Sequence, residues 1–161
     1  MNIIFTRPLI DSEDLMKNFF TSKHKIIHMP TLSISSANMN PINTKDYDGL
    51  IFTSANAVRF LKLKNDEKNT KCFCVGNLTE RSLRQKGFNN TVAASGTVNA
   101  LKNIILNSEK NIKNLAYLCG DIVSSELDKE LINEGFKVSK IINYSSTKIT
   151  ELNNETMDLM K

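Results

Sequence analysis

Small polar residues and glycines follow several short apolar runs of this sequence. The residues with the clearest chemical capacity at these positions are Arg7, Thr53, Ser54, Asn56, Gly76, Thr79, Gly120 and Asp121. A turn from a strand into a helix exposes backbone N–H groups at the positive end of the helix dipole. Such turns hold carboxylates or phosphates without many basic side chains. The pattern therefore predicts a site for an anionic ligand, although Ser54, Asn56 and Thr79 are also typical helix caps.

Common catalytic and metal-binding signatures do not occur in the chain. The sequence has no GxGxxG or GxxxxGK[ST] motif for a nucleotide and no GxSxG motif for a nucleophilic serine. The three cysteines form no CxxC pair, and the two histidines lie far from them in sequence, which argues against a zinc site or a disulfide framework. We therefore expect buried thiols, a reducing cytoplasm and no metal site.

Composition narrows the class of protein. The 161 residues are 40% hydrophobic and 24% charged, with a net charge of +4, which is typical of a soluble globular protein and suits an anionic ligand. No apolar run approaches the roughly 18 residues of a membrane-spanning helix, so we expect no membrane partner. Basic residues do not cluster with aromatic ones, so we expect no nucleic-acid partner.

Short apolar runs alternate with longer stretches of helical spacing. The runs cover residues 3–6, 25–29, 49–53, 72–75, 91–93, 115–119 and 138–144. Several are continuously apolar, as in strands that are buried on both faces. The stretches between them carry apolar stripes, the first of which joins Leu15, Phe19 and Phe20. This order predicts an α/β fold with a parallel sheet and helices on both faces.

Residues at the ends of the expected helices support this order. Ser12 precedes two acidic residues and is predicted to be an N-cap, as is Asp121. Gly87 and Gly135 each follow a helical stripe and precede a phenylalanine and a short strand. Both glycines are predicted to end their helices in the left-handed conformation that favours glycine.

Two extended polar segments flank the central block. Residues 31–35 alternate between polar and apolar, and residues 144–150 form a second polar stretch. They predict two crossings between domains, with the block between them inserted as a domain of its own. The expected boundaries are residues 1–33 for an N-terminal β-α-β, 34–144 for the inserted domain, and 145–161 for a return linker and the start of a helix at 151–160.

Several of these motifs resemble uroporphyrinogen-III synthase. The segments are NIIFTRP (residues 2–8), YDGLIFTSANAV (47–58), CVGNLT (74–79), LCGD (118–121) and IINY (141–144). Each segment is loose by itself, but the five occur in the order and spacing of that family, over almost the whole chain.

The resemblance implies two flavodoxin-like α/β domains joined by a two-stranded linker, with the active site between them. The implied reaction cyclises the linear tetrapyrrole hydroxymethylbilane to uroporphyrinogen III, with inversion of ring D and loss of water, and without a cofactor. The implied general acid is Tyr144. The implied substrate contacts are Arg7, Thr53, Ser54, Asn56, Gly76, Thr79 and Gly120. The family is expected to be monomeric.

The chain departs from the family after Tyr144, because only 17 residues follow. These residues contain no counterpart of the second half of the first domain. The incomplete first domain is therefore expected to expose strand edges, through which the chain could self-associate. A non-catalytic flavodoxin-like module that binds an anion or a nucleotide is the alternative function. A structural fragment that folds with a partner is a third.

Overall fold

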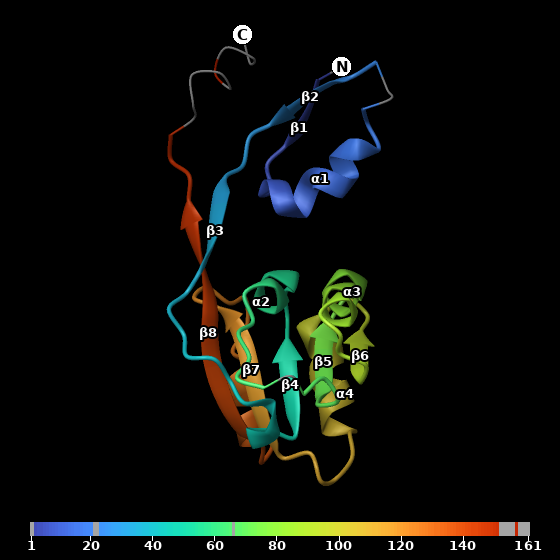
Figure 1. Cartoon of the computed structure of the whole chain (residues 1–161), viewed down its shortest axis with the longest axis vertical. Helices are drawn as coiled ribbons and strands as arrows, with labels where there is room; N and C mark the ends of the chain where they lie inside the picture. Colours follow the sequence, from blue (N-terminus) through green and yellow to red (C-terminus); the bar gives the residue numbers. More distant parts are fainter. Residues whose placement is uncertain (1, 21–22, 66, 152–156, 158–161) are drawn as a thin grey trace. The chain divides into compact units, whose positions relative to one another are not determined.

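The computed structural model of the protein describes residues 2–20, 23–65, 67–151 and 157. The chain forms two compact units, one of Met1–Ser35 with Ser146–Lys161 and the other of Ser36–Ser145 (Figure 1). The chain therefore passes between the units twice. The helix expected at 151–160 lies outside the described residues, apart from Glu151 and Met157.

The smaller unit begins with a β-α-β element. Strand β1 (Asn2–Phe5) leads into helix α1 (Leu9–Lys17) and then into strand β2 (Lys25–His28), which pairs with β1 in parallel. Met16 and Ile27 are buried in this unit, and the ring of Phe5 contacts that of Phe19 at a centroid distance of 6.0 Å. Most of its described apolar residues are exposed or half-buried, so this unit has a small core.

A six-stranded sheet has five of its strands in the larger unit, whereas most of the sixth belongs to the smaller unit. Its strands are β3 (Leu32–Ser36), β4 (Gly49–Phe52), β5 (Lys71–Val75), β6 (Thr91–Ala94), β7 (Asn114–Gly120) and β8 (Lys137–Lys148). Strands β4 to β8 pair in parallel, and β3 is hydrogen-bonded to β8 at one edge. The expected parallel α/β fold is confirmed, and both extended polar segments are strands.

Helices cover both faces of this sheet. They are α2 (Ala55–Arg59), α3 (Asn77–Gln85), α4 (Val98–Leu106) and α5 (Leu127–Asn133), with a short 3-10 helix at Thr44–Asp46 before β4. Helix α2 packs with α3, and α4 with α5. One core under α4 and α5 contains Ile51, Phe73, Leu115 and Tyr117, because alternate residues of a strand face the same side.

The strand order is β6-β5-β4-β7-β8. In sequence order this is 3-2-1-4-5, an order that doubly wound sheets share with dinucleotide-binding folds, whereas flavodoxin has 2-1-3-4-5. In both arrangements the order reverses next to the first strand. Here the reversal lies between β4 and β7, and ligands of open α/β sheets bind beyond the carboxyl ends of the strands at that point.

The glycine signals at two helix ends are confirmed. Gly87 and Gly135 have φ angles of +94° and +89°. Each following phenylalanine donates its N–H to a carbonyl five residues earlier, Phe88 to Leu83 and Phe136 to Leu131, both at 3.1 Å. This pattern closes a helix by satisfying carbonyls that have no further partner within it.

The prediction for the first helix is wrong in two respects. Helix α1 starts after Pro8, and Ser12 lies inside it, buried, with its hydroxyl donating to the carbonyls of Arg7 and Pro8. The buried face of α1 carries Ser12 and Met16, whereas Leu15 is 53% exposed. Proline sets the φ angle of a helix start, so it outweighed the later serine.

The three thiols are buried, as predicted: Cys72, Cys74 and Cys119. Burial raises the pKa of Cys74 and of Cys119 to about 11, and that of Cys72 still further. These thiols stay protonated and unreactive near neutral pH. Among the described residues, no helix has the length and apolar character needed to cross a membrane.

Asp48 fastens the start of β4 to the start of β7. Its Oδ2 accepts the N–H groups of Asn114 (2.8 Å) and Lys113 (2.9 Å), and these donors hold its pKa below the usual range. A lowered pKa in the folded state means that the ionised carboxylate stabilises the fold above its unfolded pKa. This contribution is lost as the pH falls through the folded pKa.

We therefore expect Asp48→Asn to lower the free energy of unfolding by about 1 kcal/mol at neutral pH. Between neutral pH and about pH 3, the free energy of unfolding should then fall less in the variant than in the wild type. Urea unfolding across this range measures both effects. Asp14→Asn is the matched control, because the Asp14 side chain is 88% exposed in α1. Equal pH profiles for the two variants would contradict the role of Asp48.

Candidate functional site

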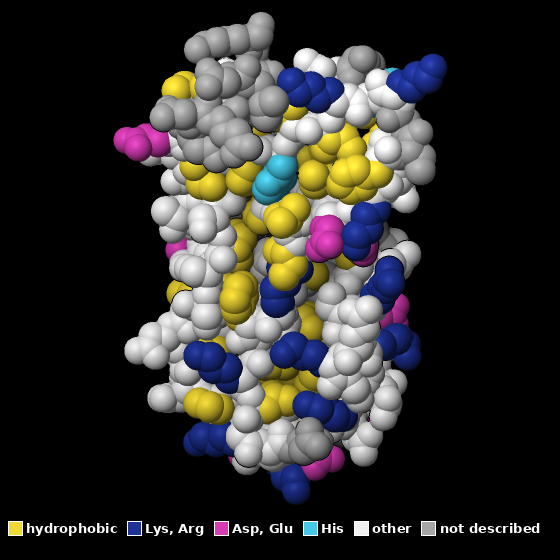
Figure 2. Space-filling view, turned by 45° about the horizontal axis from the view of Figure 1, so that its top comes forward, with side chains coloured by type: hydrophobic (Ala, Val, Ile, Leu, Met, Phe, Trp, Pro, Cys, Tyr) yellow, Lys and Arg dark blue, Asp and Glu magenta, His cyan; other side chains and the backbone are white. Residues whose placement is uncertain are grey.

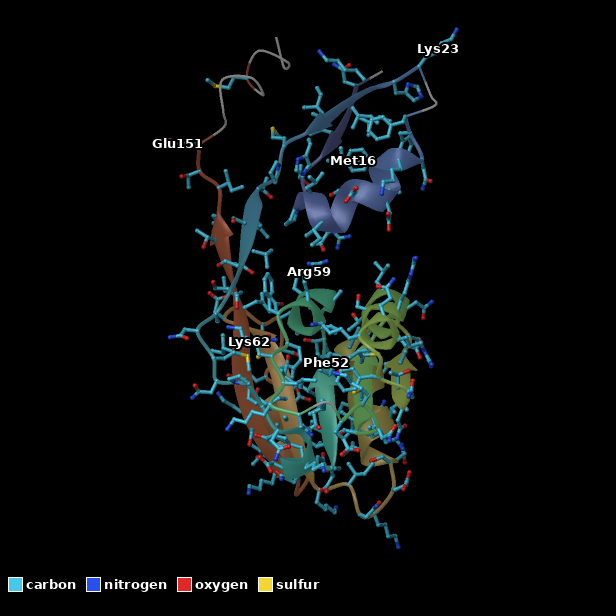
Figure 3. The ribbon with its side chains drawn as sticks, viewed as in Figure 1. Met16, Lys23, Phe52, Arg59, Lys62 and Glu151 are labelled. Atoms are coloured by element: carbon cyan, nitrogen blue, oxygen red, sulfur yellow. The ribbon has the colours of Figure 1, made fainter. Side chains whose placement is uncertain are left out.

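The carboxyl ends of β4, β5 and β7 lie at one edge of the parallel sheet in the larger unit (Figure 1). Phe52, labelled in Figure 3, is the last residue of β4 and is fully buried. All predicted site residues except Arg7 belong to this unit. Because these strands pair in parallel, predicted residues between positions 53 and 144 lie at a common edge.

The turn after β4 carries three of the predicted contacts. The Ser54 Oγ accepts the N–H of Asn56 at 3.2 Å, so Ser54 is the N-cap of α2. Asn56 lies inside α2 and is not a cap, and its Oδ1 accepts a hydrogen bond from the Arg59 guanidinium. Arg59, at the end of α2 in Figure 3, therefore orients this amide. Thr53 is half-buried, and its hydroxyl is hydrogen-bonded to Tyr117 of β7.

The turn after β5 has no side chain that caps its helix. Gly76 precedes α3 with a φ angle of +78°, a conformation that side chains rarely adopt. The first intrahelical bond joins the Glu80 N–H to the Gly76 carbonyl, so the N–H groups of Asn77, Leu78 and Thr79 come before it. Thr79 lies within the first turn, 4% exposed, and is not a cap. This helix start offers backbone donors to an anion.

The end of β7 pairs with the middle of β8 at a bulge. Cys119 is the partner of Ile142, but Gly120 is the partner of Tyr144, so β8 contains one extra residue, Asn143. A Cβ added to Gly120 would lie 2.7 Å from Cε2 and Cζ of Tyr144. The phenol ring therefore rests on the bare backbone of Gly120. The ring also stacks with that of Phe60, with centroids 6.4 Å apart.

Asn143 is a buried residue that sequence reasoning missed. It is fully buried, and its Nδ2 donates to the Ala57 carbonyl of α2 at 2.6 Å. Its Oδ1 has no hydrogen-bond partner among the described residues. An amide within the apolar run IINY was the available signal, because a buried polar group needs a partner.

Tyr117 is the second missed residue. Its side chain is 2% exposed, and its hydroxyl lies 3.2 Å from the Thr53 Oγ1. Burial raises the pKa of Tyr117 to about 12, so the phenol keeps its proton at neutral pH. Tyr144 is near enough to raise this pKa slightly further. Two phenols and one threonine hydroxyl thus gather at the ends of β4, β7 and β8.

Arg7 and Asp121 do not belong to this group of residues. Arg7 belongs to the smaller unit, where its carbonyl accepts hydrogen bonds from Ser12 and from the His28 ring, and its side chain is exposed. Asp121 is not an N-cap, because α5 begins only after Glu126; its Oδ1 accepts the N–H of Ile122 at 3.0 Å. A loop that was unforeseen from the sequence separates Asp121 from the helix.

A polar hollow of about 460 Å³ lies at the opposite, amino-terminal edge of the sheet. Tyr47 and Asp48 line it, and the ion pair between Lys71 and Glu109 lies at its wall. Its residues come before the strands, so it is separate from the site at the carboxyl edge. Within the described part of the chain, no three His, Cys, Asp or Glu residues gather as metal ligands.

Comparison with known proteins decides the family. The family model described as uroporphyrinogen-III synthase HemD matches residues 15–161. The chain belongs to the uroporphyrinogen-III synthase family. A comparison with curated proteins finds no match.

Solved structures of uroporphyrinogen-III synthases have a similar fold. The enzyme of Helicobacter pylori 26695 is 19% identical with a TM-score of 0.62, over 100% of this chain and 68% of the other. A mutant enzyme of the extremely thermophilic bacterium Thermus thermophilus is 13% identical with a TM-score of 0.62, over 92% of this chain and 64% of the other. The chain thus spans about two thirds of the length of these synthases.

We expect Gly120→Ala to lower the free energy of unfolding by about 1–3 kcal/mol, because the added methyl group overlaps the Tyr144 ring. Chemical denaturation measures this loss. Tyr144→Leu removes the ring that the methyl group would strike, so the double variant should lose less than the sum of the two single losses. Additive losses would mean that the close approach has no energetic role.

Asn143→Ala should cost about 1–3 kcal/mol of stability, because the buried Ala57 carbonyl loses its donor. Asn133→Ala, at an exposed position near the end of α5, is the control and should change stability little. Denaturant titration compares the two. A loss of equal size in both variants would show that the bond to Ala57 contributes nothing specific.

Proposed function

We propose that this chain acts as a uroporphyrinogen-III synthase. It would bind hydroxymethylbilane and cyclise it to uroporphyrinogen III, with inversion of ring D and loss of water. The proposal rests on the groups that lie together at the carboxyl edge of the sheet in the larger unit. There, N–H-rich turns at Ser54 and Gly76 share one sheet edge with the Tyr144 phenol in a chain of this family.

The chemistry of the substrate fits this edge. A linear tetrapyrrole carries many carboxylates on flat apolar rings. The start of α3, without a side-chain cap, supplies donors for a carboxylate. Leu78 and Ile122 follow the two glycines of the edge and are 70% and 71% exposed, which suits contact with the rings. Figure 2 shows apolar patches on the molecular surface, with Lys and Arg side chains spread between them.

The reaction needs positioning more than a protein nucleophile. The electron pair of a pyrrole nitrogen expels the terminal hydroxyl, and a proton delivered to that oxygen lets it leave as water. We assign the proton to the Tyr144 phenol, whose ring is held between Gly120 and Phe60. Holding the chain so that ring closure occurs at the inverted position is catalysis by orientation.

The predicted contacts have separate roles in this proposal. Gly76 and the first turn of α3 would bind carboxylates through backbone donors, and Thr53, Ser54 and Thr79 through their hydroxyl groups. Asn56, oriented by Arg59, would offer its amide N–H₂. Gly120 would act by admitting the Tyr144 ring. Arg7 belongs to the smaller unit, where its side chain is exposed, and has no role at this edge in the proposal.

The proposal is tested by supplying hydroxymethylbilane and resolving the isomers that form. The type III isomer is expected, and only the type I isomer at the enzyme-free rate would contradict it. Tyr144→Phe should lower turnover by about 10²-fold if the phenol is the general acid. Tyr47→Phe, at the opposite edge of the sheet, is the matched control and should keep full turnover.

A second function is a module that binds the ligand without converting it. Backbone donors at the start of α3 can hold an anion without any catalytic group, which favours this alternative. A titration with a stable carboxylated porphyrin separates the two, because a module binds without turnover. The double variant Ser54→Ala and Thr79→Ala should weaken this binding about tenfold or more. Unchanged affinity would reduce both residues to structural roles.

A further inference from the structure

Tyr117 has an unusual place for a polar side chain. Ile51 of β4 is its partner in the sheet, and Thr53 lies two residues further along the chain on the same face. The long phenol therefore reaches diagonally to the Thr53 Oγ1, at 3.2 Å. Tyr117 belongs to the same buried apolar core as Leu115, Cys119 and Leu127. In the described residues, Thr53 is the one hydrogen-bond partner seen for this hydroxyl.

The direction of this bond follows from burial. A buried phenol O–H needs an acceptor, and the Thr53 Oγ1 is the acceptor within reach. Asp128 and Tyr144 act on Tyr117 electrostatically but form no hydrogen bond with it among the described contacts, and Asp128 faces Lys140 at 3.4 Å. Burial therefore favours Tyr117 as the donor and Thr53 as the acceptor.

This direction has a consequence for Thr53. A threonine hydroxyl that accepts a bond still has its own proton to donate. Thr53 follows the last residue of β4, is half-buried, and lies where the strand order reverses between β4 and β7. The neighbouring Ser54 also accepts a bond, but from the backbone N–H of Asn56 as the helix cap and not from a buried side chain. Thr53 is thus the hydroxyl at this edge whose proton is directed by a buried partner.

We propose that Tyr117 is a positioning residue that holds the Thr53 oxygen as an acceptor, so that the Thr53 O–H donates to a carboxylate of the ligand. The identity of that ligand as a carboxylated tetrapyrrole rests on the proposed function. Tyr117 itself does not touch the ligand, since it is buried under the sheet edge. Its effect on binding passes entirely through Thr53.

The direction of the bond can be measured without any ligand. In the Raman spectrum, the intensity ratio of the tyrosine Fermi doublet separates a phenol that donates from one that accepts. The difference spectrum between wild type and Tyr117→Phe isolates this residue from Tyr47 and Tyr144. We expect a donating phenol, and a shift of its ratio in Thr53→Val. An accepting phenol, or a ratio that ignores Thr53→Val, would overturn the proposal.

The consequence for the ligand is measured by titrating the full chain with uroporphyrin, a stable octacarboxylate. Thr53→Val should weaken binding about tenfold and Tyr117→Phe by a few-fold, through loss of one oriented donor. The two losses should not add, because Tyr117 acts through Thr53. Thr53→Ser keeps the hydroxyl and should restore most of the affinity, and Tyr47→Phe should leave it unchanged.

Two outcomes of the titration would overturn the inference. One is additive losses in the double variant, and the other is a Tyr117→Phe variant that loses thermal stability but binds as tightly as wild type. A wild-type chain that binds no uroporphyrin would contradict the proposed function and the carboxylate contact. The Raman result then still decides the direction of the bond from Tyr117 to Thr53.

Discussion

The hydrogen bond from the Asn143 amide to the Ala57 carbonyl joins the bulge of β8 to helix α2 in a fully buried position. A bulge is rare between parallel strands, and it shifts the register by one residue. Without this shift, Tyr144 would not be the partner of Gly120. The placement of the phenol on Gly120 and against Phe60 therefore depends on an amide that is not itself at the surface.

Backbone geometry supplies most of what the carboxyl edge offers. The start of α3 presents N–H groups because Gly76 takes a positive φ angle and carries no capping side chain. Ser54, by contrast, uses its oxygen to cap its own helix. A net charge of +4 is enough background for such a site, since oriented N–H dipoles carry the local attraction for an anion.

Much of the larger unit could be predicted from the sequence, and the site only in part. Continuous apolar runs mark strands that are buried on both faces, and Gly87 and Gly135 mark helix ends, because both signals are local. The start and the buried face of α1 were harder to predict, because Pro8 sets the start and the apolar residues of the helix do not all face the core. The prediction of Asp121 as an N-cap was wrong because a loop separates it from α5, and no local sequence pattern indicates that loop.

The sequence by itself determined the α/β class, the order of the elements, the family motifs and which strand-end residues are candidates for binding an anion. Only the tertiary structure decided which of these residues meet. The bond between Tyr117 and Thr53 spans 64 positions, and that between Asn143 and Ala57 spans 86. Such contacts depend on strand order and on a one-residue change of register, and neither is encoded in the spacing of nearby residues.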